Sequence, residues 1–334
     1  MIIMGQGLAK RSALLLLVGC LCSGLLTGLA KPWKRHTIDS SSKAAGKLGA
    51  DGVRLADVNG DGLLDITTGW EQGGAIVVYQ NPGPAKARAA WPSVTVGRVV
   101  SPEDAMFIDL DNDGNLDVVS SCEGSARTMY IHWAPPKRGD YWNPSAWRTE
   151  AIPATKGKQL WMFAAPARLD CRGADELFVS SKGGNASIGF LVRKDPDSLA
   201  RDAGGFEYVK LRSAGWIMSL EPLDMDGDGD TDLIYSDRRG ANRGVGWLEN
   251  PGSATIRKPT AWKDHLLGGQ GKEVMFLDAA DLDGDDDTDI VCTTRSQQLL
   301  IFKKADTKWD VDTLPNPYGL PHGKAVAIGD VNGD

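Results

Sequence analysis

A nine-residue segment rich in aspartate recurs along the chain at a nearly regular spacing. Complete copies read DVNGDGLLD, DLDNDGNLD, DMDGDGDTD and DLDGDDDTD, and they begin at Asp57, Asp109, Asp224 and Asp281. A degenerate copy, RLDCRGADE, begins at Arg168, and the chain ends inside a sixth copy, DVNGD. Successive copies start 49 to 59 residues apart. A period of this length predicts repeated supersecondary units, such as propeller blades or solenoid repeats.

The residue types of the complete copies are those of a loop that binds a hard cation. Side-chain oxygens at positions 1, 3, 5 and 9, a sharp bend at position 6 and a main-chain carbonyl at position 7 match the first part of an EF-hand-like calcium loop. One such segment could equally be a solvated acidic turn, since Asp, Asn and Gly are the commonest turn formers. Four complete copies in one chain favour calcium.

The predicted metal ligands follow from these positions. In the four complete loops they are Asp57, Asn59, Asp61, Leu63 and Asp65; Asp109, Asp111, Asp113, Asn115 and Asp117; Asp224, Asp226, Asp228, Asp230 and Asp232; and Asp281, Asp283, Asp285, Asp287 and Asp289. The segment at the end of the chain adds Asp330, Asn332 and Asp334, but it lacks the later ligands. We therefore expect about four complete calcium sites.

Two copies depart from the pattern. In the degenerate copy, Arg168 and Arg172 stand where the first and third ligands should be, so we expect no metal there and a bridge from Arg172 to Asp170 and Glu176 instead. In the loop that begins at Asp281, Asp286 takes the glycine position. Aspartate tolerates a left-handed backbone better than most residues, so this loop is expected to bind metal with some strain.

The sequence around each loop predicts β-structure. Residues 53–57 enter the first loop, residues 65–70 leave it, residues 75–83 follow a Gly-rich turn, and residues 91–99 begin with a Trp. The Trp recurs at Trp33, Trp147, Trp262 and Trp309. β-Branched residues and Gly/Pro punctuation favour strands over helices. Four short antiparallel strands per repeat predict a propeller blade.

This combination resembles the FG-GAP (VCBS) family of secreted calcium-binding β-propellers, which includes the integrin α-subunit head. The resemblance covers nearly everything after residue 32. It implies an all-β propeller of four-stranded antiparallel blades over residues 31–334, with five complete blades and the start of a sixth. It also implies that the calcium loop joins the first and second strands of a blade and mainly rigidifies it. Activity is left open, because propellers host binding modules and enzymes alike.

Both ends of the repeat region carry single strands in this interpretation. Residues 324–331 read as a further first strand, and residues 33–39 read as an unpaired fourth strand. We therefore expect the chain to be truncated at its C-terminus and the natural product to continue past Asp334 by about 40 residues or more. Open first-strand edges should make the 334-residue chain prone to association.

The first thirty residues read as a targeting segment. Lys10 and Arg11 precede an apolar run that ends in small residues, which predicts a signal peptide over residues 1–30 with cleavage after Ala30 and no membrane span in the mature chain. A lipoprotein anchored at Cys20 is the alternative. Either form is secreted, periplasmic or at the cell surface. The net charge of -7 argues against a nucleic-acid partner.

Candidate functional residues gather where propellers usually bind ligands, in the loops that lead into first strands and join second to third strands. These loops contain Glu71, Glu123, Arg127, Lys182, Arg295, residues 237–243 and two tryptophans expected to be exposed, Trp161 and Trp216. The alternative explanation is that these tryptophans and the methionines of the same loops, Met106, Met162, Met218 and Met275, belong to the blade core and that the charged groups form a solvated edge. Aromatic, guanidinium and carboxylate groups on one rim suit sugars, especially acidic ones.

Two functional classes remain open, so the sequence leaves enzyme status undecided. The first is a binding module for a polysaccharide or an extracellular protein. The second is a polysaccharide lyase or sugar dehydratase with a site at the central channel, where a base removes a proton and a cation offsets the developing charge. The catalytic candidates for the second class are His322, Lys324, Arg54, Arg127 and Arg239. No organic cofactor is expected.

Overall fold

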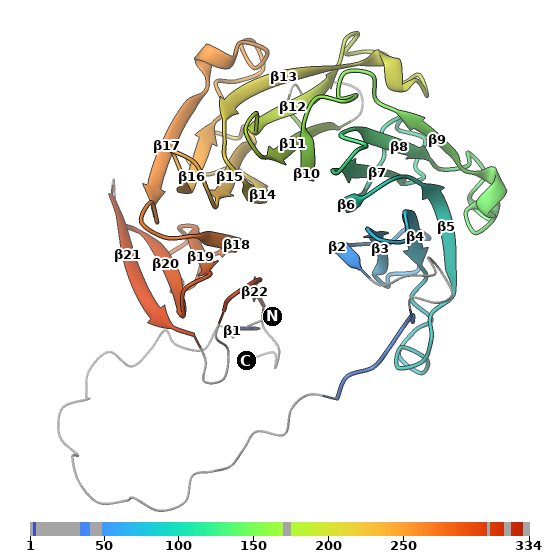
Figure 1. Ribbon diagram of the computed structural model, residues 1–334, viewed down its shortest axis with the longest axis horizontal. Helices are drawn as coiled ribbons and strands as arrows, with labels where there is room; N and C mark the ends of the chain where they lie inside the picture. The colour runs from blue at the N-terminus through green and yellow to red at the C-terminus, as the bar shows by residue number, and fades with distance from the viewer. Residues whose placement is uncertain are drawn as a thin grey trace, which may run out of the picture.

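The computed structural model describes residues 3–4, 34–40, 49–169, 175–305, 308–316 and 322–329. Its regular structure is almost entirely β, in five four-stranded antiparallel sheets (Figure 1). Each sheet consists of four strands consecutive in the chain, so each sequence repeat forms one blade. The predicted all-β architecture with five complete four-stranded blades is confirmed.

The strand bounds follow the repeats. The first blade has β2 (Ala50–Ala56), β3 (Asp65–Trp70), β4 (Ala75–Tyr79) and β5 (Ser93–Arg98), and the second has β6 (Pro102–Ile108), β7 (Asp117–Cys122), β8 (Met129–Trp133) and β9 (Arg148–Ala151). The third has β10 (Leu160–Ala167), β11 (Glu176–Lys182), β12 (Ser187–Arg193) and β13 (Phe206–Ser213). The fourth has β14 (Ile217–Leu223), β15 (Asp232–Asp237), β16 (Gly244–Glu249) and β17 (Lys263–Gly268). The fifth has β18 (Val274–Ala280), β19 (Asp289–Thr294), β20 (Gln298–Ala305) and β21 (Lys308–Pro315).

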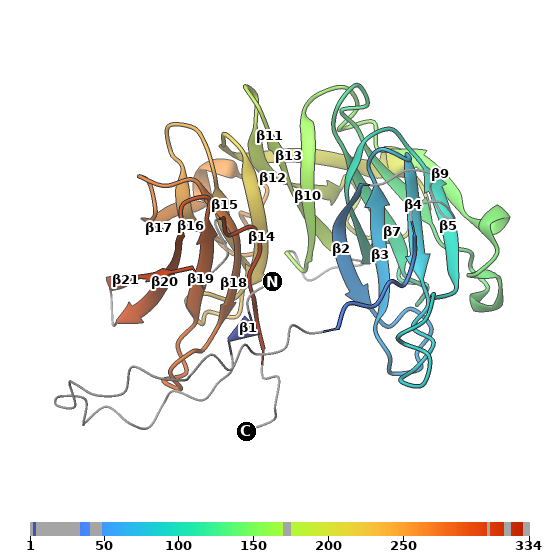
Figure 2. The same ribbon diagram turned by 60° about the horizontal axis from the view of Figure 1, so that its bottom comes forward.

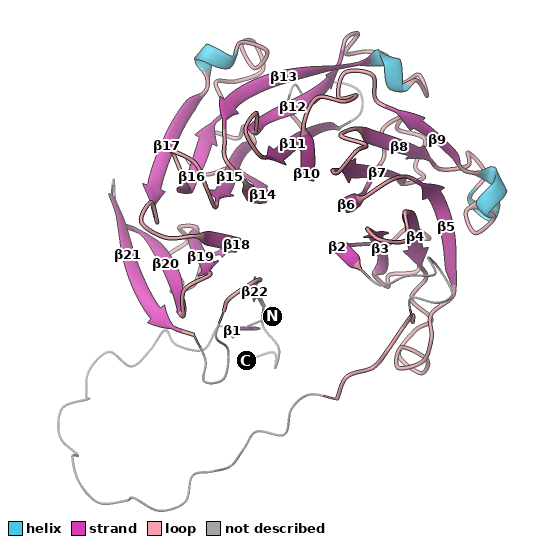
Figure 3. Ribbon diagram, in the orientation of Figure 1, coloured by secondary structure: helices cyan, strands magenta, loops and turns pink. Residues whose placement is uncertain are grey.

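The blades fan around a common axis with the first strand of each blade innermost (Figure 1). The inner strands of successive blades contact one another, β2 with β6, β6 with β10, β10 with β14 and β14 with β18. Beyond the fifth blade, β22 (Ala327–Ile328) lies against β18 and pairs in parallel with β1 (Ile3–Met4). Short 3₁₀ helices lie at the outer perimeter (Figure 3), namely η1 (Arg138–Asp140), η2 (Pro144–Ala146), η3 (Ala203–Gly205) and η4 (Pro259–Ala261).

The middle strands are buried on both faces because each blade is sandwiched between its neighbours. β4 reads AIVVY and every residue of it is buried, as is every residue of β12. Such runs lack the polar alternation of a half-exposed strand. The core consists largely of apolar clusters between adjacent blades. In one of them Trp262 packs edge-on against Phe178, with 5.9 Å between ring centroids.

The recurrent tryptophan before the fourth strand has a structural role. The indole N–H of Trp147 donates to the carbonyl of Tyr141 at 2.8 Å, and that of Trp262 donates to the carbonyl of Ile256 at 2.9 Å. Each bond ties the end of the third-to-fourth connection to its own earlier backbone while the ring is buried. The sequence repeat of tryptophan therefore reflects loop closure and packing.

The terminal strands differ from the sequence expectation. Residues 34–40 form no regular strand, and the N–H of Trp91 donates to the carbonyl of Ile38 (2.9 Å), which joins their backbone to the first blade. A side-chain bond from Tyr79 to Asp39 (2.8 Å) adds to this contact. The predicted first strand over residues 324–331 is present only as β22. Residues 330–334 and, apart from Ile3–Met4, the predicted signal peptide lie outside the described residues.

Candidate functional site

Two opposite faces of the propeller carry different chemistry. The strands of a blade are antiparallel, so every loop from first to second strand lies at one end of the blades (Figure 2). The second-to-third connections and the segments that lead into first strands lie at the other end. We refer to these as the loop face, which carries the aspartate-rich loops, and the rim face. The predicted calcium ligands and the predicted rim residues are thus on opposite sides of the molecule.

The first aspartate of a loop organises its backbone. Asp57 accepts hydrogen bonds from the N–H groups of Gly60 (2.7 Å), Asp61 (3.1 Å) and Gly62 (2.8 Å). Asp281 is bonded in the same way by Gly284 and Asp286. These backbone bonds, with that of Gly62 the strongest for Asp57, lower the pKa of both carboxyl groups. In these two loops the first carboxylate is therefore held ionised, as a calcium ligand must be.

Left-handed backbone occurs twice in each complete loop. At position 6 the φ angles are 80° for Gly62, 81° for Gly114, 90° for Gly229 and 68° for Asp286. Asp286 thus adopts the left-handed conformation expected from its place in the pattern. Position 4 is also left-handed in every complete loop, at Gly60, Asn112, Gly227 and Gly284. The sequence contained this second signal, glycine or asparagine at position 4, but our interpretation did not use it.

The ninth carboxylate is buried and bonded through both oxygens. Asp65 accepts from the N–H of Val58 (3.1 Å) and the N–H of Asn81 (2.7 Å), so it joins the loop to the end of the third strand. Asp117 makes the equivalent bonds to Leu110 and Ala134. Burial raises the pKa of Asp117 to about 8, despite these bonds. A nearby cation would offset this cost of burying charge.

Within each of three loops, the acidic side chains converge closely enough to bind one ion. Ligand oxygens lie within 4.8 Å of one another in the groups Asp109, Asp111 and Asp113; Asp224, Asp226 and Asp232; and Asp281, Asp283 and Asp285. In addition, Oδ1 of Asp111 is buried without a hydrogen-bond partner among the described residues. An all-oxygen donor set of this kind fits calcium. In the first loop Asn59 donates to Asp61 at 3.0 Å, so these two ligands are also adjacent.

The degenerate loop pairs its arginine with a neighbouring carboxylate. Nε of Arg168 lies 2.9 Å from Oδ1 of Asp175. The predicted bridge from Arg172 falls outside the described residues, as does Asp170. A guanidinium at the first ligand position leaves no carboxylate there for calcium.

On the rim face, three glutamates and one lysine form a compact cluster. Ligand oxygens of Glu71, Glu103 and Glu123 lie within 4.8 Å of one another. Nζ of Lys182 pairs with Glu103 at 3.0 Å and also with Glu123. Burial, followed by the hydrogen bond with the Glu123 carboxylate, raises the pKa of Glu103 to about 7. One ammonium therefore pairs with two of the three carboxyl groups, and this part of the rim is acidic.

The neighbouring part of the rim is basic and is built around Trp216. Cationic groups lie near its ring centroid at 4.9 Å for Lys182, 4.5 Å for Arg238 and 4.9 Å for Arg239. Glu273 pairs with Arg238 (3.1 Å), Arg239 (3.5 Å) and Arg295 (3.6 Å). Three guanidinium groups thus share one carboxylate. We call Trp216, Arg238, Arg239, Glu273 and Arg295 the arginine cluster.

The tryptophans and methionines of the rim separate into two groups. Trp161 is fully buried, so its predicted exposure is wrong; its indole donates to the carbonyl of Thr155, and its ring packs against Tyr208. Trp216 is half-buried, as part of the arginine cluster. The equivalent methionines are core residues, which the alternative explanation anticipated: Met106, Met162, Met218 and Met275.

The five catalytic candidates are spread over the axis and the rim. Arg239 belongs to the arginine cluster, and Nδ1 of His322 lies 2.8 Å from the carbonyl oxygen of Arg295, beside it. Arg127 lies in the turn after β7 with a φ of 47°. Lys324 is exposed, and its carbonyl accepts from Thr293. No hydrogen bond or ion pair joins any two of the five within the described part of the chain.

The fifth candidate, Arg54, lies in the wall of the central channel. Its Nη2 pairs with Oδ2 of Asp104 at 3.0 Å, and the Asp104 side chain is only 1% exposed. Arg54 and Glu221 line a cavity of about 430 Å³ between the inner strands. Burial, followed by the charge of Asp278, raises the pKa of Glu221. The channel wall therefore carries charged groups among mostly apolar residues, and Asp104 offsets the charge of Arg54.

Comparison with known families identifies the repeats. The model of the FG-GAP-like repeat matches residues 57–120 and 224–292. Each matched segment begins at the first residue of a complete loop and contains the next complete loop, so the two segments include all four. The repeat family predicted from the sequence is confirmed.

The solved structures to which this chain is similar are distant in sequence. An α-L-arabinofuranosidase from Lactobacillus brevis has 13% identity and a TM-score of 0.49, covering 87% of this chain and 99% of that one. Sqt1 from Saccharomyces cerevisiae has 9% identity and a TM-score of 0.49, covering 84% of this chain and 67% of that one. The comparison with curated proteins gives no match. Among the described residues, no helix has the length and apolarity needed to span a bilayer.

Proposed function

Because this chain carries FG-GAP-like repeats, we propose that it is an extracytoplasmic, calcium-binding β-propeller that binds an anionic polysaccharide on its rim face. Calcium on the loop face would stabilise the blades, and the arginine cluster on the opposite face would bind the ligand. Secretion rests on the signal peptide predicted over residues 1–30.

The observation that carries the ligand proposal is the shared carboxylate of Glu273. Arg238, Arg239 and Arg295 all pair with it, so the cluster holds more positive than negative charge. The side chains of Arg239 and Arg295 are 52% and 49% exposed, so their donors remain accessible. Guanidinium groups bind carboxylates with two parallel hydrogen bonds, which suits uronic acids or sulfated sugars.

Trp216 supports the cluster by orienting its cations. Lys182, Arg238 and Arg239 all lie within 5 Å of its ring centroid, where cation–π attraction favours them. This arrangement reduces the freedom that the side chains would lose on binding. The adjacent acidic cluster at Glu71, Glu103 and Glu123 would repel an acid group placed there. An anionic ligand would therefore be directed to the arginine side of the rim.

Calorimetric titration with oligogalacturonate, compared with a neutral oligosaccharide of the same length, tests this proposal. We expect binding of the acidic oligomer only, and a loss of about tenfold or more in affinity for Arg239→Gln. Arg257→Gln is the matched control, because Arg257 is a partly exposed arginine that pairs with Glu207 outside the cluster. Equal affinity for the neutral and acidic oligomers, or no effect of Arg239→Gln, would contradict the proposal.

An acidic-sugar lyase or dehydratase is the second candidate, and the position of His322 favours it. If Nδ1–H of His322 donates to the carbonyl of Arg295, the other ring nitrogen is left to accept a proton beside the arginine cluster. A lyase would remove the proton next to a uronate carboxyl group while arginines offset the developing charge. Incubation with polygalacturonate should then yield an unsaturated product seen by ultraviolet absorbance, and His322→Ala should abolish it. Without that product, the function is binding alone.

The calcium proposal rests on the chemistry of the four complete loops. Their first ligands accept hydrogen bonds from backbone N–H groups, their ninth ligands are buried, and three of the loops bring carboxylate oxygens within 4.8 Å of one another. Calcium would be held by the side chains of positions 1, 3, 5 and 9 and the carbonyl of position 7. It would supply positive charge to a site that otherwise concentrates negative charge.

A further inference from the structure

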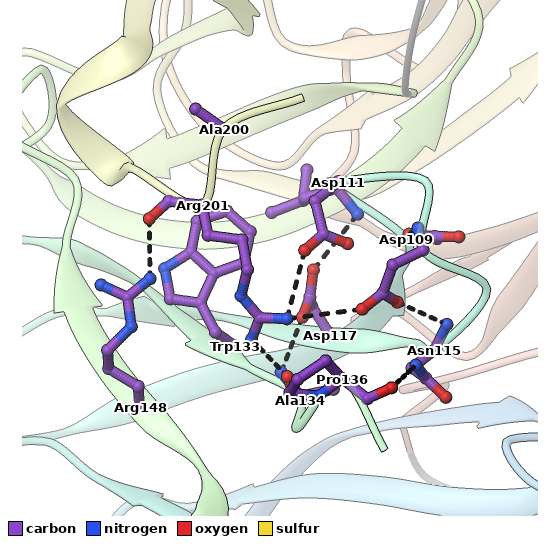
Figure 4. Close-up of polar contacts among 12 residues, drawn as sticks. Asp109, Asp111, Asn115, Asp117, Trp133, Ala134, Pro136, Arg148, Ala200 and Arg201 are labelled. Carbon is purple, nitrogen blue, oxygen red and sulfur yellow. Dashed lines mark hydrogen bonds and ion pairs between the residues drawn. The ribbon is translucent and has the colours of Figure 1, made fainter. Parts of the chain in front are cut away.

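One calcium loop receives a guanidinium from the neighbouring blade. Arg201 lies in the connection between β12 and β13 of the third blade, and it reaches the loop that begins at Asp109 in the second blade (Figure 4). Its Nη1 lies 3.2 Å from Oδ2 of Asp111 and 3.4 Å from Oδ2 of Asp113. These carboxylates are at positions 3 and 5 of the loop, two of the predicted calcium ligands. The guanidinium therefore pairs with two carboxylates that would otherwise be available to a calcium ion.

Arg201 is held in this position from several sides. Its Nη2 donates to the carbonyl of Ala134, and its guanidinium carbon lies 5.4 Å from the ring centroid of Trp133. Its own carbonyl accepts a hydrogen bond from Arg148 at 2.7 Å. The side chain is 27% exposed, against 76% for Arg168 in the degenerate loop. Arg201 thus forms a fixed contact between the second and third blades.

Asp111 shows that the guanidinium leaves part of the site unfilled. Its side chain is 4% exposed, and its Oδ2 pairs with Arg201. Its Oδ1 is buried and has no hydrogen-bond partner among the described residues. A buried carboxylate oxygen without a partner is costly, and calcium would satisfy it. The carboxylate of Asp111 can therefore pair with either of two cations, the guanidinium of Arg201 or calcium.

We infer that Arg201 is a tethered cation that competes with calcium for Asp111 and Asp113, so that calcium binding at this loop displaces Arg201 from its contact between the second and third blades. This inference rests on the proposed calcium binding. A divalent ion and a guanidinium at adjacent positions would repel each other while sharing the same ligands. The loop that begins at Asp109 therefore binds calcium more weakly than those that begin at Asp57 and Asp224.

The other complete loops provide the comparison. In the described part of the chain, no lysine or arginine forms an ion pair with the predicted ligands of the loops at Asp57 and Asp224. In the loop at Asp281, Lys303 pairs with Asp283 at 2.9 Å, again at position 3, but the two side chains are 37% and 39% exposed. Exposed pairs of this kind contribute little. Lys303 is therefore a matched control for Arg201.

Calcium titration of chelator-stripped protein, followed by calorimetry, tests the competition. Arg201→Gln should raise the affinity of one site by about tenfold or more, whereas Lys303→Gln should change no site by more than about threefold. Arg201→Lys, which keeps the charge but loses the fork, should give an intermediate affinity. Identical titrations for the wild type and Arg201→Gln would overturn the inference. If the wild type and all three variants failed to bind calcium, the proposed calcium function would fail as well.

Melting temperatures in chelator test the contact independently of calcium. Arg201→Gln should lower the melting temperature, because it leaves the Asp111 carboxylate buried without its cation. In the Asp111→Asn background, Arg201→Gln should lower the melting temperature much less, since the carboxylate charge that pairs with Arg201 is absent. Equal effects in the two backgrounds would show that Arg201 does not serve Asp111 and would overturn the inference.

Discussion

Glu176 accepts a hydrogen bond from the backbone N–H of Leu169 at 3.0 Å, across the loop whose first ligand position holds Arg168. All four complete loops make this bond, from the N–H of position 2 to the carboxylate of position 9, at Asp65, Asp117, Asp232 and Asp289. The bond persists where an arginine has replaced the first ligand. The ninth carboxylate therefore has a role in the fold that does not depend on metal.

Asp65→Asn is expected to destabilise the protein even in the presence of chelator. An amide in place of the carboxylate can accept only one of the two backbone bonds, from Val58 or Asn81, and leaves the other N–H without its acceptor. The expected loss is about 1–3 kcal/mol in the free energy of unfolding. Urea denaturation in chelator measures it. Asp61→Asn, at an exposed position of the same loop, is the control and should cost less than about 0.5 kcal/mol under those conditions.

Asp286 should respond to substitution according to its left-handed backbone. Its φ of 68° is one that most residues with a side chain avoid. Asp286→Ala is therefore expected to destabilise the protein by about 1 kcal/mol, whereas Asp286→Gly should be neutral or stabilising. Thermal unfolding of both variants in chelator measures the difference without a contribution from bound metal. A higher melting temperature for the alanine variant than for the glycine variant would rule out backbone strain at this position.

Glu103 should make stability depend on pH in the range below neutrality. Burial raises its pKa from 4.5 to about 7 in the folded protein, so the folded state binds the proton more tightly than the unfolded state. Its contribution to stability is then greatest below pH 4.5 and is lost as the pH rises to about 7. The contribution falls by at most about 1.4 kcal/mol per pH unit.

Urea denaturation between pH 5 and pH 8 measures this effect. Glu103→Gln cannot titrate, so the variant should lose less stability than the wild type as the pH rises across this range. Glu207→Gln, which removes a carboxyl group on β13 outside the cluster, should keep the wild-type pH dependence. A Glu103→Gln profile parallel to that of the wild type would refute the expected contribution.

The repeats and their strands could be predicted because the information is local and recurs. Each blade carries its own loop, its β-branched strands and an aromatic residue near the start of its fourth strand, a tryptophan in four blades and Phe206 in the third, so one interpretation applied to all five. The left-handed backbone of Asp286 was also predictable, since the position is fixed by alignment with Gly62, Gly114 and Gly229. Local rules of this kind require no knowledge of tertiary contacts.

Contacts between blades were not predictable in the same way. Arg201 and Asp113 are 88 residues apart, and nothing in the local sequence of either indicates the other. Trp161 aligns with Ile217 of the next repeat, and both are buried. Trp216 lies one position earlier, and Lys182 of the preceding blade is 4.9 Å from its ring centroid, a contact that the repeat pattern does not encode.

Calorimetric titration of calcium into chelator-stripped protein shows whether the aspartate-rich loops hold calcium. We expect about four sites, three of them tight, with the loop at Asp109 weaker because Arg201 competes there. The melting temperature should rise as the sites fill, since calcium binds the folded state. One site or none, with no rise in melting temperature, would refute calcium binding by these loops.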